Sequence, residues 1–411
     1  MVNPIIYVLA GGEGTRLAPL TMHRCKPAVP FAGRYRLIDF ALSNALKAKS
    51  SKIYTLTQYL SHSLNSHIRE TYHNKIEILT ANHAHYDGTA DSIRKNLSTL
   101  ETSNTEHVII LSGDQLYSMD LNEMVESAKT SNSDLLIATL PINEEEAGRM
   151  GVMKIGQNKE IIDFIEKPGD EESLKKFALK PHTTNKIHAL DERIFLGSMG
   201  IYIFKRNVLI NLLKENAGVD FGKDIIPYHL KHGTASAYVF DGYWEDIGTI
   251  SSYYKASIKL LDHSLSLDLF GKECFLHPNV SNLPSAFISN CSIERSRISD
   301  GCSIHAQELS YSLLGLKTSI GAGSILRGVI TLGNISENTS TTIGKNCFLE
   351  KVIIDEDAVI EDGVELTLNG LSLPDADMGP ITIKNGIIIV KQGAFVPKNF
   401  HILENREYRS A

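Results

Sequence analysis

The chain has 411 residues, which is long for one domain, so we expect two domains. Hydrophobic residues make up 42% and charged residues 22% of the sequence, and the net charge of −7 argues against broad electrostatic binding to nucleic acid or to an anionic membrane. Five scattered cysteines without a CxxC pair favour reduced thiols, and the sequence shows neither a basic leader nor an apolar stretch of membrane-spanning length, so we expect a cytoplasmic protein.

The first predicted element is a strand over 5–10, IIYVLA, and a glycine-rich turn follows it directly. The turn combines three glycines with two polar residues: Gly11, Gly12, Gly14, Thr15 and Arg16. Glycines let backbone N–H groups approach an anion closely, and a guanidinium can grip two oxygens, so the turn favours phosphate binding over a purely structural role. It is not a P-loop, which needs Lys and Ser/Thr after its last glycine, and the third glycine of the dinucleotide fingerprint is replaced by Leu17.

From residue 1 to about 247, short apolar runs alternate with segments of helical period, which predicts a mostly parallel sheet covered by helices in an α/β fold. Further strands are expected over 52–59, 107–114 and 134–142, and helices over 36–49, 89–101 and 120–130. In such sheets, ligands bind beyond the carboxyl ends of the strands, where the glycine turn also lies.

Charged side chains gather at or near several of these strand ends. They are Arg24 and Lys26 in HRCKP, Asp114 after HVIIL, Glu166 and Lys167 in FIEKP, and Asp246 in YWEDIGT. A carboxylate at a strand end is well placed to hold a divalent metal, although Asp114 could instead cap a following helix. Aspartates and cations from separate strand ends suit phosphoryl or nucleotidyl transfer, which depends on positioning, metal neutralisation and charge stabilisation rather than on a protein nucleophile.

After residue 275, helical periodicity fades and aliphatic residues recur every five or six positions. They are Ile288, Ile293, Ile298, Ile304, Ile320 and Leu326, and later Leu349, Ile354, Ile360 and Leu366. This hexad suits a triangular parallel β-helix, because each short strand points one side chain inward and small polar residues turn the corners. The alternative of an irregular β-sandwich is not excluded, since the spacing of the aliphatic residues becomes irregular around 306–319 and 331–342. The polar stretch 331–342 would protrude as a loop, and 386–397 would form a last pair of strands.

In content and order these motifs closely resemble the family of bacterial glucose-1-phosphate adenylyltransferases, or ADP-glucose pyrophosphorylases, over essentially the whole chain. The matching stretches are LAGGEGTRLAPLT, RCKPAVPFAGRYRLIDFALSN, LTQYLSHSL, YDGTADSI, SGDQLY, GVM, FIEKP, GSMGIYIF, DFGKDIIP and YWEDIGT. The resemblance implies a Rossmann-like nucleotide-diphospho-sugar transferase domain followed by a left-handed parallel β-helix. We therefore divide the chain into a catalytic domain over 1–262 that includes a connector helix over 250–262, a linker over 263–278 and a β-helix over 279–411.

The resemblance also implies an activity and a set of roles. The reaction would be the Mg²⁺-dependent formation of ADP-glucose and diphosphate from ATP and glucose 1-phosphate, the committing step of glycogen synthesis, in a homotetramer. The implied catalytic residues are Arg16, Lys26, Asp114 and Asp246, of which Asp114 and Asp246 would hold the metal. The implied ATP-binding residues are Leu9, Ala10, Gly11, Gly12, Gly14, Thr15, Arg16, Gln58, Gly88 and Thr89. The implied glucose-1-phosphate-binding residues are Tyr86, Gly151, Glu166, Lys167, Ser198 and Asp224.

Relatives in this family respond to sugar phosphates and AMP through cations at the domain junction, and the resemblance matches Arg24 and Arg36 to two of these positions. In the β-helix, Lys351 falls about where the family has an arginine, and it is a third candidate. Some neighbouring family positions carry different residues here, among them His23, Pro30 and His85. The effector is therefore open, and so is the existence of regulation.

Three other functions stay open. A catalytically silent regulatory subunit would be free to lose several catalytic residues, whereas the set is intact here. An acyltransferase, another activity of hexad β-helices, would need a histidine base such as His277 or His305. The same mechanism could use UTP or another sugar phosphate, because base selection rests on backbone geometry that the sequence does not display.

Overall fold

The computed structural model describes residues 3–81, 85–179, 194–262, 276–277, 282–334 and 340–402. The chain folds into two compact units that do not follow the order of the sequence. The first comprises Met1–Gly11, Phe40–Gly113 and Tyr117–Trp244, and the second comprises Gly12–Asp39, Asp114–Leu116 and Glu245–Ala411. Most of the glycine turn, Lys26, Asp114 and Asp246 therefore belong to the same unit as the predicted β-helix.

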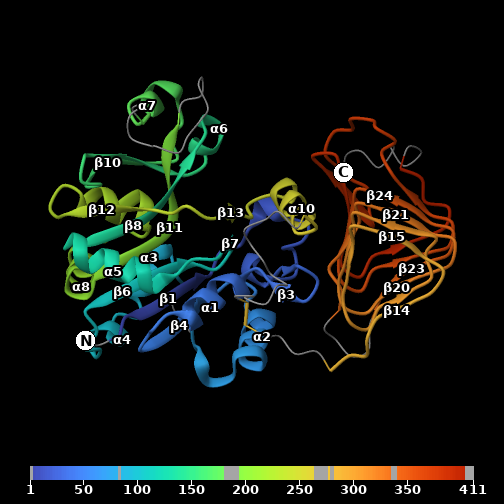
Figure 1. The fold of residues 1–411 in the computed structure, drawn as a ribbon, viewed down its shortest axis with the longest axis horizontal. Helices are drawn as coiled ribbons and strands as arrows, with labels where there is room; N and C mark the ends of the chain where they lie inside the picture. Colours follow the sequence, from blue (N-terminus) through green and yellow to red (C-terminus); the bar gives the residue numbers. More distant parts are fainter. Residues whose placement is uncertain are drawn as a thin grey trace. The chain divides into compact units, whose positions relative to one another are not determined.

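A nine-stranded sheet forms the centre of the first unit (Figure 1). Its order is β10-β9-β11-β6-β1-β4-β5, with β8 paired to β11 and β12. The strands around β1 are parallel, as predicted, whereas β11 runs antiparallel to β6, β8 and β9, so the sheet is mixed. The strands are β1 Ile5–Ala10, β4 Lys52–Thr57, β5 Glu77–Thr80, β6 His107–Ser112, β8 Leu135–Ile142, β9 Gly151–Ile155, β10 Ile161–Glu166, β11 Phe195–Lys205 and β12 Ala235–Val239.

Helices lie between these strands, and four of them, α1, α3, α4 and α5, fall in the three segments where the helical period predicts them. The helices are α1 Ile38–Lys47, α2 His62–Tyr72, α3 Thr89–Arg94, α4 Ser98–Glu101, α5 Leu121–Ser131, α6 Glu144–Ala147, α7 Glu171–Lys175, α8 Arg206–Glu215 and α9 Ile226–His229. The predicted helix over 89–101 is interrupted between α3 and α4. The main core of the unit joins the sheet to α3 and α8 through residues such as Tyr7, Ile93 and Leu209, which are fully buried.

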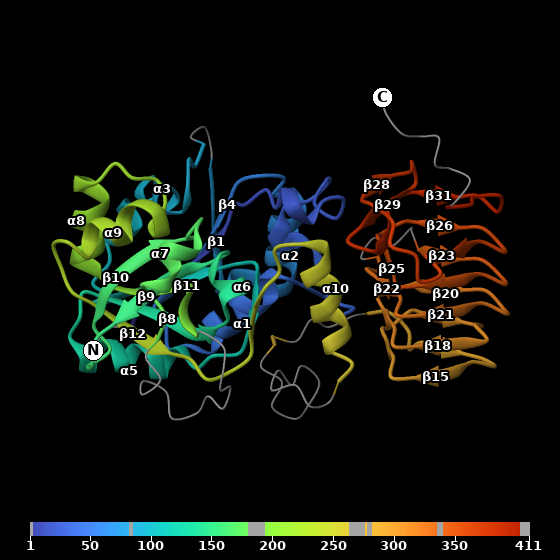
Figure 2. The ribbon, with the colours of Figure 1, turned by 90° about the horizontal axis from the view of Figure 1, so that it is seen from above.

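Short strands, parallel except where β28, β29 and β30 pair antiparallel, form the predicted coil in the second unit, and Figure 2 shows their turns stacked on one another. The first sheet contains β14 Phe287–Ile288, β17 Ser303–Ile304, β20 Thr318–Ile320, β23 Thr341–Ile343, β26 Val359–Ile360 and β31 Phe395–Val396. The second contains β15 Ser292–Glu294, β18 Glu308–Ser310, β21 Ile325–Arg327, β24 Phe348–Glu350 and β27 Glu365–Leu366. The third contains β16 Arg297–Ile298, β19 Leu313–Leu314, β22 Ile330–Thr331, β25 Val352–Ile354, β30 Ile387–Val390, β29 Ile381–Lys384 and β28 Ala376–Asp377.

The in-register stacking of this coil excludes the β-sandwich. Along the first sheet, Ile304, Ile320 and Ile343 lie in register with one another, and all three are buried. The hexad continues through the stretch where the spacing slips, because Leu309 and Leu314 supply the buried side chains between Ile304 and Ile320. The predicted loop over 331–342 overlaps the end of β22 at Thr331 and the start of β23 at Thr341, and its residues 335–339 lie outside the described part of the chain.

Helix α10 (Ile250–Lys259) and the segment 12–39 pack against the coil within the second unit. The predicted connector helix begins at a capping box in which Thr249 accepts from the Ser252 N–H. The Tyr253 hydroxyl donates to the Pro30 carbonyl at 2.7 Å, and the Tyr254 hydroxyl donates to the Gly328 carbonyl of the coil at 2.8 Å. In the described part of the chain, no helix is long and apolar enough to cross a membrane.

Candidate active site

The glycine turn leaves strand β1 and exposes its backbone. Gly12, Thr15 and Arg16 are exposed, and a Cβ added at Gly12 would meet nothing within 4 Å. Gly14 has a φ of 69°, and a Cβ there would lie 2.6 Å from the Lys26 Cβ. Only glycine tolerates both the left-handed backbone and this approach. The turn is therefore open to a ligand on one side and packed against Lys26 on the other.

Lys26 lies between the two predicted metal-binding carboxylates. It begins the 3-10 turn η2 (Lys26–Ala28), and its Nζ is 2.7 Å from Asp114 Oδ2 and 3.2 Å from Asp246 Oδ1. The two aspartates come together because the short strands β7 (Gln115–Tyr117) and β13 (Trp244–Asp246) pair with each other. Burial would lower the pKa of the Lys26 ammonium, but Asp114 and Asp246 outweigh it, and the pKa is raised.

Arg16 faces the same group of charges. A Cβ on Gly248 would lie 3.1 Å from Asp246 Oδ2 and 3.3 Å from the Arg16 Nη2, so both side chains pass close to the Gly248 backbone. The structure thus gathers all four predicted catalytic residues within the second unit. Asp114 does not cap a helix: β7 follows it, and α5 is capped instead by Asp120, whose Oδ1 accepts from the Asn122 N–H at 2.9 Å. The capping alternative for Asp114 is wrong.

The two aspartates suit a magnesium ion that is shared with a substrate. Mg²⁺ prefers one or two protein carboxylates and completes its octahedral shell with water and substrate phosphates. Asp114 and Asp246 retain partly exposed side chains, 25% and 43%, so their remaining oxygens are accessible. Among the described residues, no group of three or more His, Cys, Asp or Glu side chains is arranged to hold a metal. Two carboxylates therefore suit a metal ion that arrives with substrate phosphates better than one that the protein alone coordinates.

The predicted sugar-phosphate residues Gly151, Glu166 and Lys167 lie together in the first unit. Lys167 Nζ is 3.2 Å from Glu166 Oε1, and the Lys167 N–H donates to the Met150 carbonyl at 3.0 Å. A Cβ on Gly151 would lie 2.7 Å from Glu166 Oε2, and one on Gly222 would lie 2.6 Å away. The Glu166 carboxylate therefore packs against two glycines, whereas the Lys167 side chain is 56% exposed.

Ser198 and Tyr86 are more buried than expected for side chains that contact a ligand directly. Ser198 is buried in β11, where its hydroxyl bonds Tyr202, whose pKa burial raises. Tyr86 is buried in the main core, and its hydroxyl accepts from Asn96 Nδ2 at 3.0 Å. Gln58 forms a reciprocal pair with the Tyr86 backbone: its Oε1 accepts from the N–H, and its Nε2 donates to the carbonyl at 3.2 Å.

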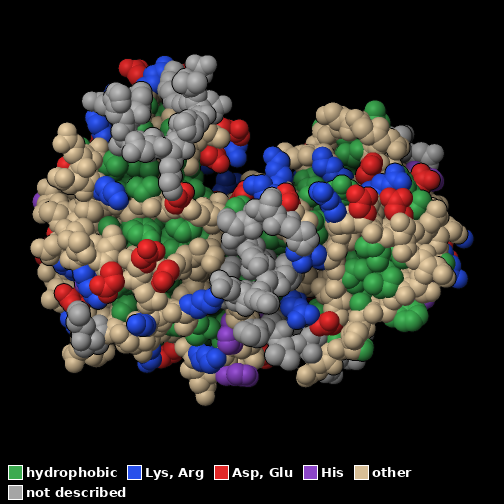
Figure 3. Space-filling model, in the orientation of Figure 1, with side chains coloured by type: hydrophobic (Ala, Val, Ile, Leu, Met, Phe, Trp, Pro, Cys, Tyr) green, Lys and Arg blue, Asp and Glu red, His purple; other side chains and the backbone are tan. Residues whose placement is uncertain are grey.

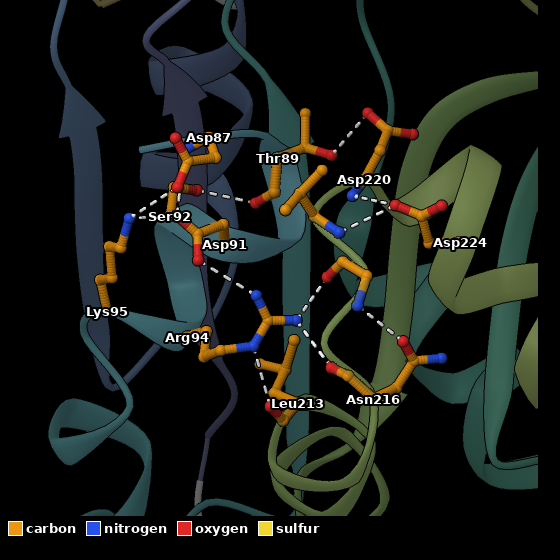
Figure 4. A network of polar contacts seen from close by, with 12 residues as sticks. Asp87, Thr89, Asp91, Ser92, Arg94, Lys95, Leu213, Asn216, Asp220 and Asp224 are labelled. Atoms are coloured by element: carbon orange, nitrogen blue, oxygen red, sulfur yellow. Dashed lines mark hydrogen bonds and ion pairs between the residues drawn. The ribbon is translucent and has the colours of Figure 1, made fainter. Parts of the chain in front are cut away.

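The turn before α3, which carries the predicted nucleotide residues Gly88 and Thr89, is bonded to the turn before the π-helix η4 (Phe221–Ile225), as Figure 4 shows. Thr89 Oγ1 donates to Asp220 Oδ2 at 3.1 Å and accepts from the Phe221 N–H at 3.0 Å. Gly88 leaves no room for a side chain, since its Cβ would lie 2.4 Å from the Val219 carbonyl oxygen. Because Gly222 of η4 also contacts Glu166, η4 joins the predicted nucleotide residues to the predicted sugar residues.

Asp224 and Asp220 have different roles in this turn from those that the sequence predicts. Asp224 Oδ2 accepts from the Val219 N–H at 2.8 Å and the Asp220 N–H at 2.9 Å, so this oxygen fixes the backbone. Asp220 caps η4, because its Oδ1 accepts from the Gly222 N–H at 2.9 Å. Sequence reasoning selected Asp224 and missed Asp220, although the two aspartates of DFGKD were the available signal.

The three predicted effector cations do not form one exposed group. Arg24 is buried and bonded to Asp355 at 2.9 Å and to Glu356 at 2.7 Å. Arg36 is also buried, and burial lowers its pKa against the attraction of Glu356. Lys351 is exposed at a turn of the coil with a φ of 55°, and the contacts of the described residues do not join it to either arginine. Sequence reasoning missed Asp355 and Glu356, because no local pattern marks a partner so distant in the chain.

Comparison with known protein families gives two matches. Residues 5–263 match the nucleotidyl transferase family, and residues 281–400 match the GLGC left-handed parallel beta-helix domain. The first match covers more than half of the chain. The second gives the coil its left-handed class.

Proposed function

Because the chain belongs to the ADP-glucose pyrophosphorylase family of nucleotidyltransferases, we propose that it transfers the adenylyl group of ATP to glucose 1-phosphate and releases diphosphate. The observation that carries this proposal is the convergence of Asp114 and Asp246 on Lys26, beside the glycine turn. The reaction would commit glucose 1-phosphate to glycogen synthesis in the cytoplasm. Leu9, Ala10 and the turn after them would contact ATP.

The chemistry needs little more than alignment and charge stabilisation. A phosphate oxygen of glucose 1-phosphate attacks the α-phosphorus of ATP, the bond from that phosphorus to the bridging oxygen breaks, and diphosphate leaves with the bond's electrons. The attacking oxygen is already anionic, so no general base is required. Arg16 and Lys26 stabilise the charge that moves onto diphosphate. Asp114 and Asp246 would hold Mg²⁺, which would supply neutralisation of the charge on the reacting phosphate oxygens.

The proposed sugar-phosphate residues would divide recognition between hydroxyls and phosphate. Glu166 would accept from sugar hydroxyls; its carboxylate lies against Gly151 and Gly222, where a larger residue would leave it no room. Lys167 has the more exposed side chain and would pair with the sugar phosphate. Gly151, Tyr86, Ser198 and Asp224 would shape the site; the contacts of Asp224 favour a role in fixing its turn.

Assembly and regulation belong to the same proposal. We propose a homotetramer that uses the coil surface, which carries exposed hydrophobic side chains (Figure 3). Phe287 and Phe395, on the first and last strands of one coil sheet, are 60% and 55% exposed. Sugar phosphates or AMP would act as effectors through Arg24, Arg36 and Lys351. For Arg24, such an anion would have to displace two carboxylates.

Diphosphate release with ATP, UTP, GTP and dTTP, each with glucose 1-phosphate and Mg²⁺, tests the proposed reaction. We expect ATP to give the highest kcat/KM and ADP-glucose to be the product. A preference for UTP would mean that the protein uses another nucleotide by the same mechanism. Absence of diphosphate release with every nucleotide, together with effector binding, would favour the silent regulatory subunit. Acetyl transfer from acetyl coenzyme A would instead favour the acyltransferase.

A further inference from the structure

Arg24 and two consecutive carboxylates of the coil form a buried ionic group. Arg24 Nη1 is 2.9 Å from Asp355 Oδ1, and its Nη2 is 2.7 Å from Glu356 Oε2. The exposed fractions of the three side chains are 5%, 2% and 18%. All three residues belong to the second unit. Each terminal nitrogen of the guanidinium thus bonds one of the two carboxylates that follow strand β25.

The coil holds these carboxylates in a fixed geometry. The Asp355 N–H donates to the Val390 carbonyl at 3.0 Å, which continues the pairing of β25 with β30. The Glu356 N–H donates to Asp355 Oδ1 at 2.7 Å, so Asp355 also orients its neighbour. Burial would lower the pKa of Arg24, but Asp355 and Glu356 outweigh it, and the pKa is raised. Arg24 therefore stays ionised, whereas burial raises the pKa of the Asp355 and Glu356 carboxyls against its attraction.

On its other side, Arg24 supports the turn that leads to Lys26. Its Nη1 also donates to the Leu20 carbonyl at 3.3 Å. The neighbouring Thr21 hydroxyl donates to the Gly14 carbonyl at 3.0 Å, and Gly14 packs against the Lys26 side chain. The anchored segment thus includes the glycine turn at one end and Lys26, two residues after Arg24, at the other.

A buried ion pair contributes little net stability, because desolvation offsets the attraction, so its use is often to specify one geometry. We propose that Asp355 and Glu356 are positioning residues of the nucleotidyl-transfer site, which act through Arg24 to hold Lys26 and the glycine turn in place. This inference rests on the proposed function. It makes the coil part of the active-site architecture.

The test compares Glu356→Gln and Asp355→Asn with Asp300→Asn in the full-length protein. Asp300 is the matched control, because its ion pair with Arg34 also joins segment 12–39 to the coil. Arg34 Nη2 lies 2.5 Å from Asp300 Oδ2, and this pair is partly exposed. Steady-state kinetics give kcat and the KM of each substrate, and thermal unfolding reports folding. Acetylation of Lys26 by acetic anhydride, followed by peptide mass spectrometry, reports its environment without turnover.

We expect Glu356→Gln to lower kcat by about ten- to a hundredfold, because a misplacement of about 1 Å has that effect on aligned groups. The KM of ATP should rise, that of glucose 1-phosphate should stay within about twofold of wild type, and Lys26 should be acetylated faster. Asp300→Asn should match wild type in all of these. If Asp355→Asn unfolds, Glu356→Gln decides the matter, since its side chain is less buried.

Two results separate the failures. If the wild type turns over and folded Glu356→Gln matches Asp300→Asn in kcat, KM and acetylation, the positioning role is wrong while the proposed function stands. If the wild type shows no nucleotidyl transfer, the proposed function fails, and the acetylation rates still decide whether Glu356 fixes Lys26.

Discussion

Lys26 and Asp114 form an ion pair of 2.7 Å, and Asp246 Oδ1 lies 3.2 Å from the same ammonium. The lysine is buried while both carboxylates keep exposed surface. The Lys26 ammonium and the two carboxylates lie beside the open glycine turn. Their charges would therefore suit a phosphate and a metal ion in one place. Four residue substitutions and one pH experiment follow from this site and its neighbours.

Asp114→Asn should lower kcat by orders of magnitude with little loss of folding. The amide keeps the shape of the side chain but loses the charge that holds Mg²⁺. Initial rates over a Mg²⁺ titration, with thermal unfolding alongside, measure both effects. Asp120→Asn is the control, because Asp120 only caps α5 and asparagine is an equally good cap. Full activity of Asp114→Asn at ordinary Mg²⁺ would remove Asp114 from the metal site.

Lys26 should remain protonated throughout the working pH range. Its folded pKa is raised, so its ionic contribution to stability is complete below the ordinary value of about 10.4 and is lost only as pH rises through the higher folded value. We therefore expect no loss of kcat from this group between about pH 7 and about pH 9. The pH dependence of Lys26 acetylation gives its pKa directly. A midpoint below the ordinary value would contradict the ion-pair account.

Arg94→Ala should raise the KM of ATP by about tenfold. Arg94 Nε donates to the Leu213 carbonyl at 2.9 Å and its Nη2 to the Asn216 carbonyl at 2.9 Å, which holds the turn that Thr89 contacts (Figure 4). Arg206→Ala is the matched control, because Arg206 binds the Leu100 and Glu101 carbonyls in the same manner at the other end of α8.

Comparison of these two variants by steady-state kinetics separates positioning from general destabilisation. Both should lose some thermal stability, since each loses several backbone hydrogen bonds. Only Arg94→Ala should change the KM of ATP. Equal KM values for the two variants would assign Arg94 a purely structural role.

Lys167→Ala should chiefly raise the KM of glucose 1-phosphate. Its side chain extends beside Glu166 and is largely exposed, so its loss would remove the proposed phosphate contact without disturbing the core. Lys175→Ala, which breaks the exposed ion pair with Glu171 in the same unit, is the control and should match wild type. If the KM of ATP alone moved in Lys167→Ala, the sugar-phosphate assignment would be wrong.

The sequence predicts those features of the fold and site that depend on local pattern. Strand β1 and the glycine turn are readable because an apolar run and a left-handed glycine are local requirements. Asp114 is readable because it follows a strand in an α/β sheet. The coil is readable from its repeat, including the stretch around Leu309 and Leu314 where the spacing slips.

The features that the sequence does not predict depend on tertiary contacts. The helix expected over 89–101 is interrupted between Arg94 and Ser98, and Arg94 turns its guanidinium to distant carbonyls there. Asp224 follows the family motif, yet its carboxylate fixes the turn beside it. Asp355 meets Arg24 only because the register of the coil brings β25 to that segment. The partners of Arg94 and Arg24 are distant in the chain, so no local pattern marks them, whereas Asp224 bonds the backbone of its own turn.

The most direct test of the central claim is the transfer of label from ATP carrying ³²P at the α-phosphate. Wild type, Asp114→Asn and Lys26→Met are incubated with this ATP, glucose 1-phosphate and Mg²⁺, and the products are separated. The account predicts labelled ADP-glucose and unlabelled diphosphate from wild type, and at least about a hundredfold slower labelling by both variants. Undiminished labelling by the variants, or no labelled sugar nucleotide from wild type, would contradict it.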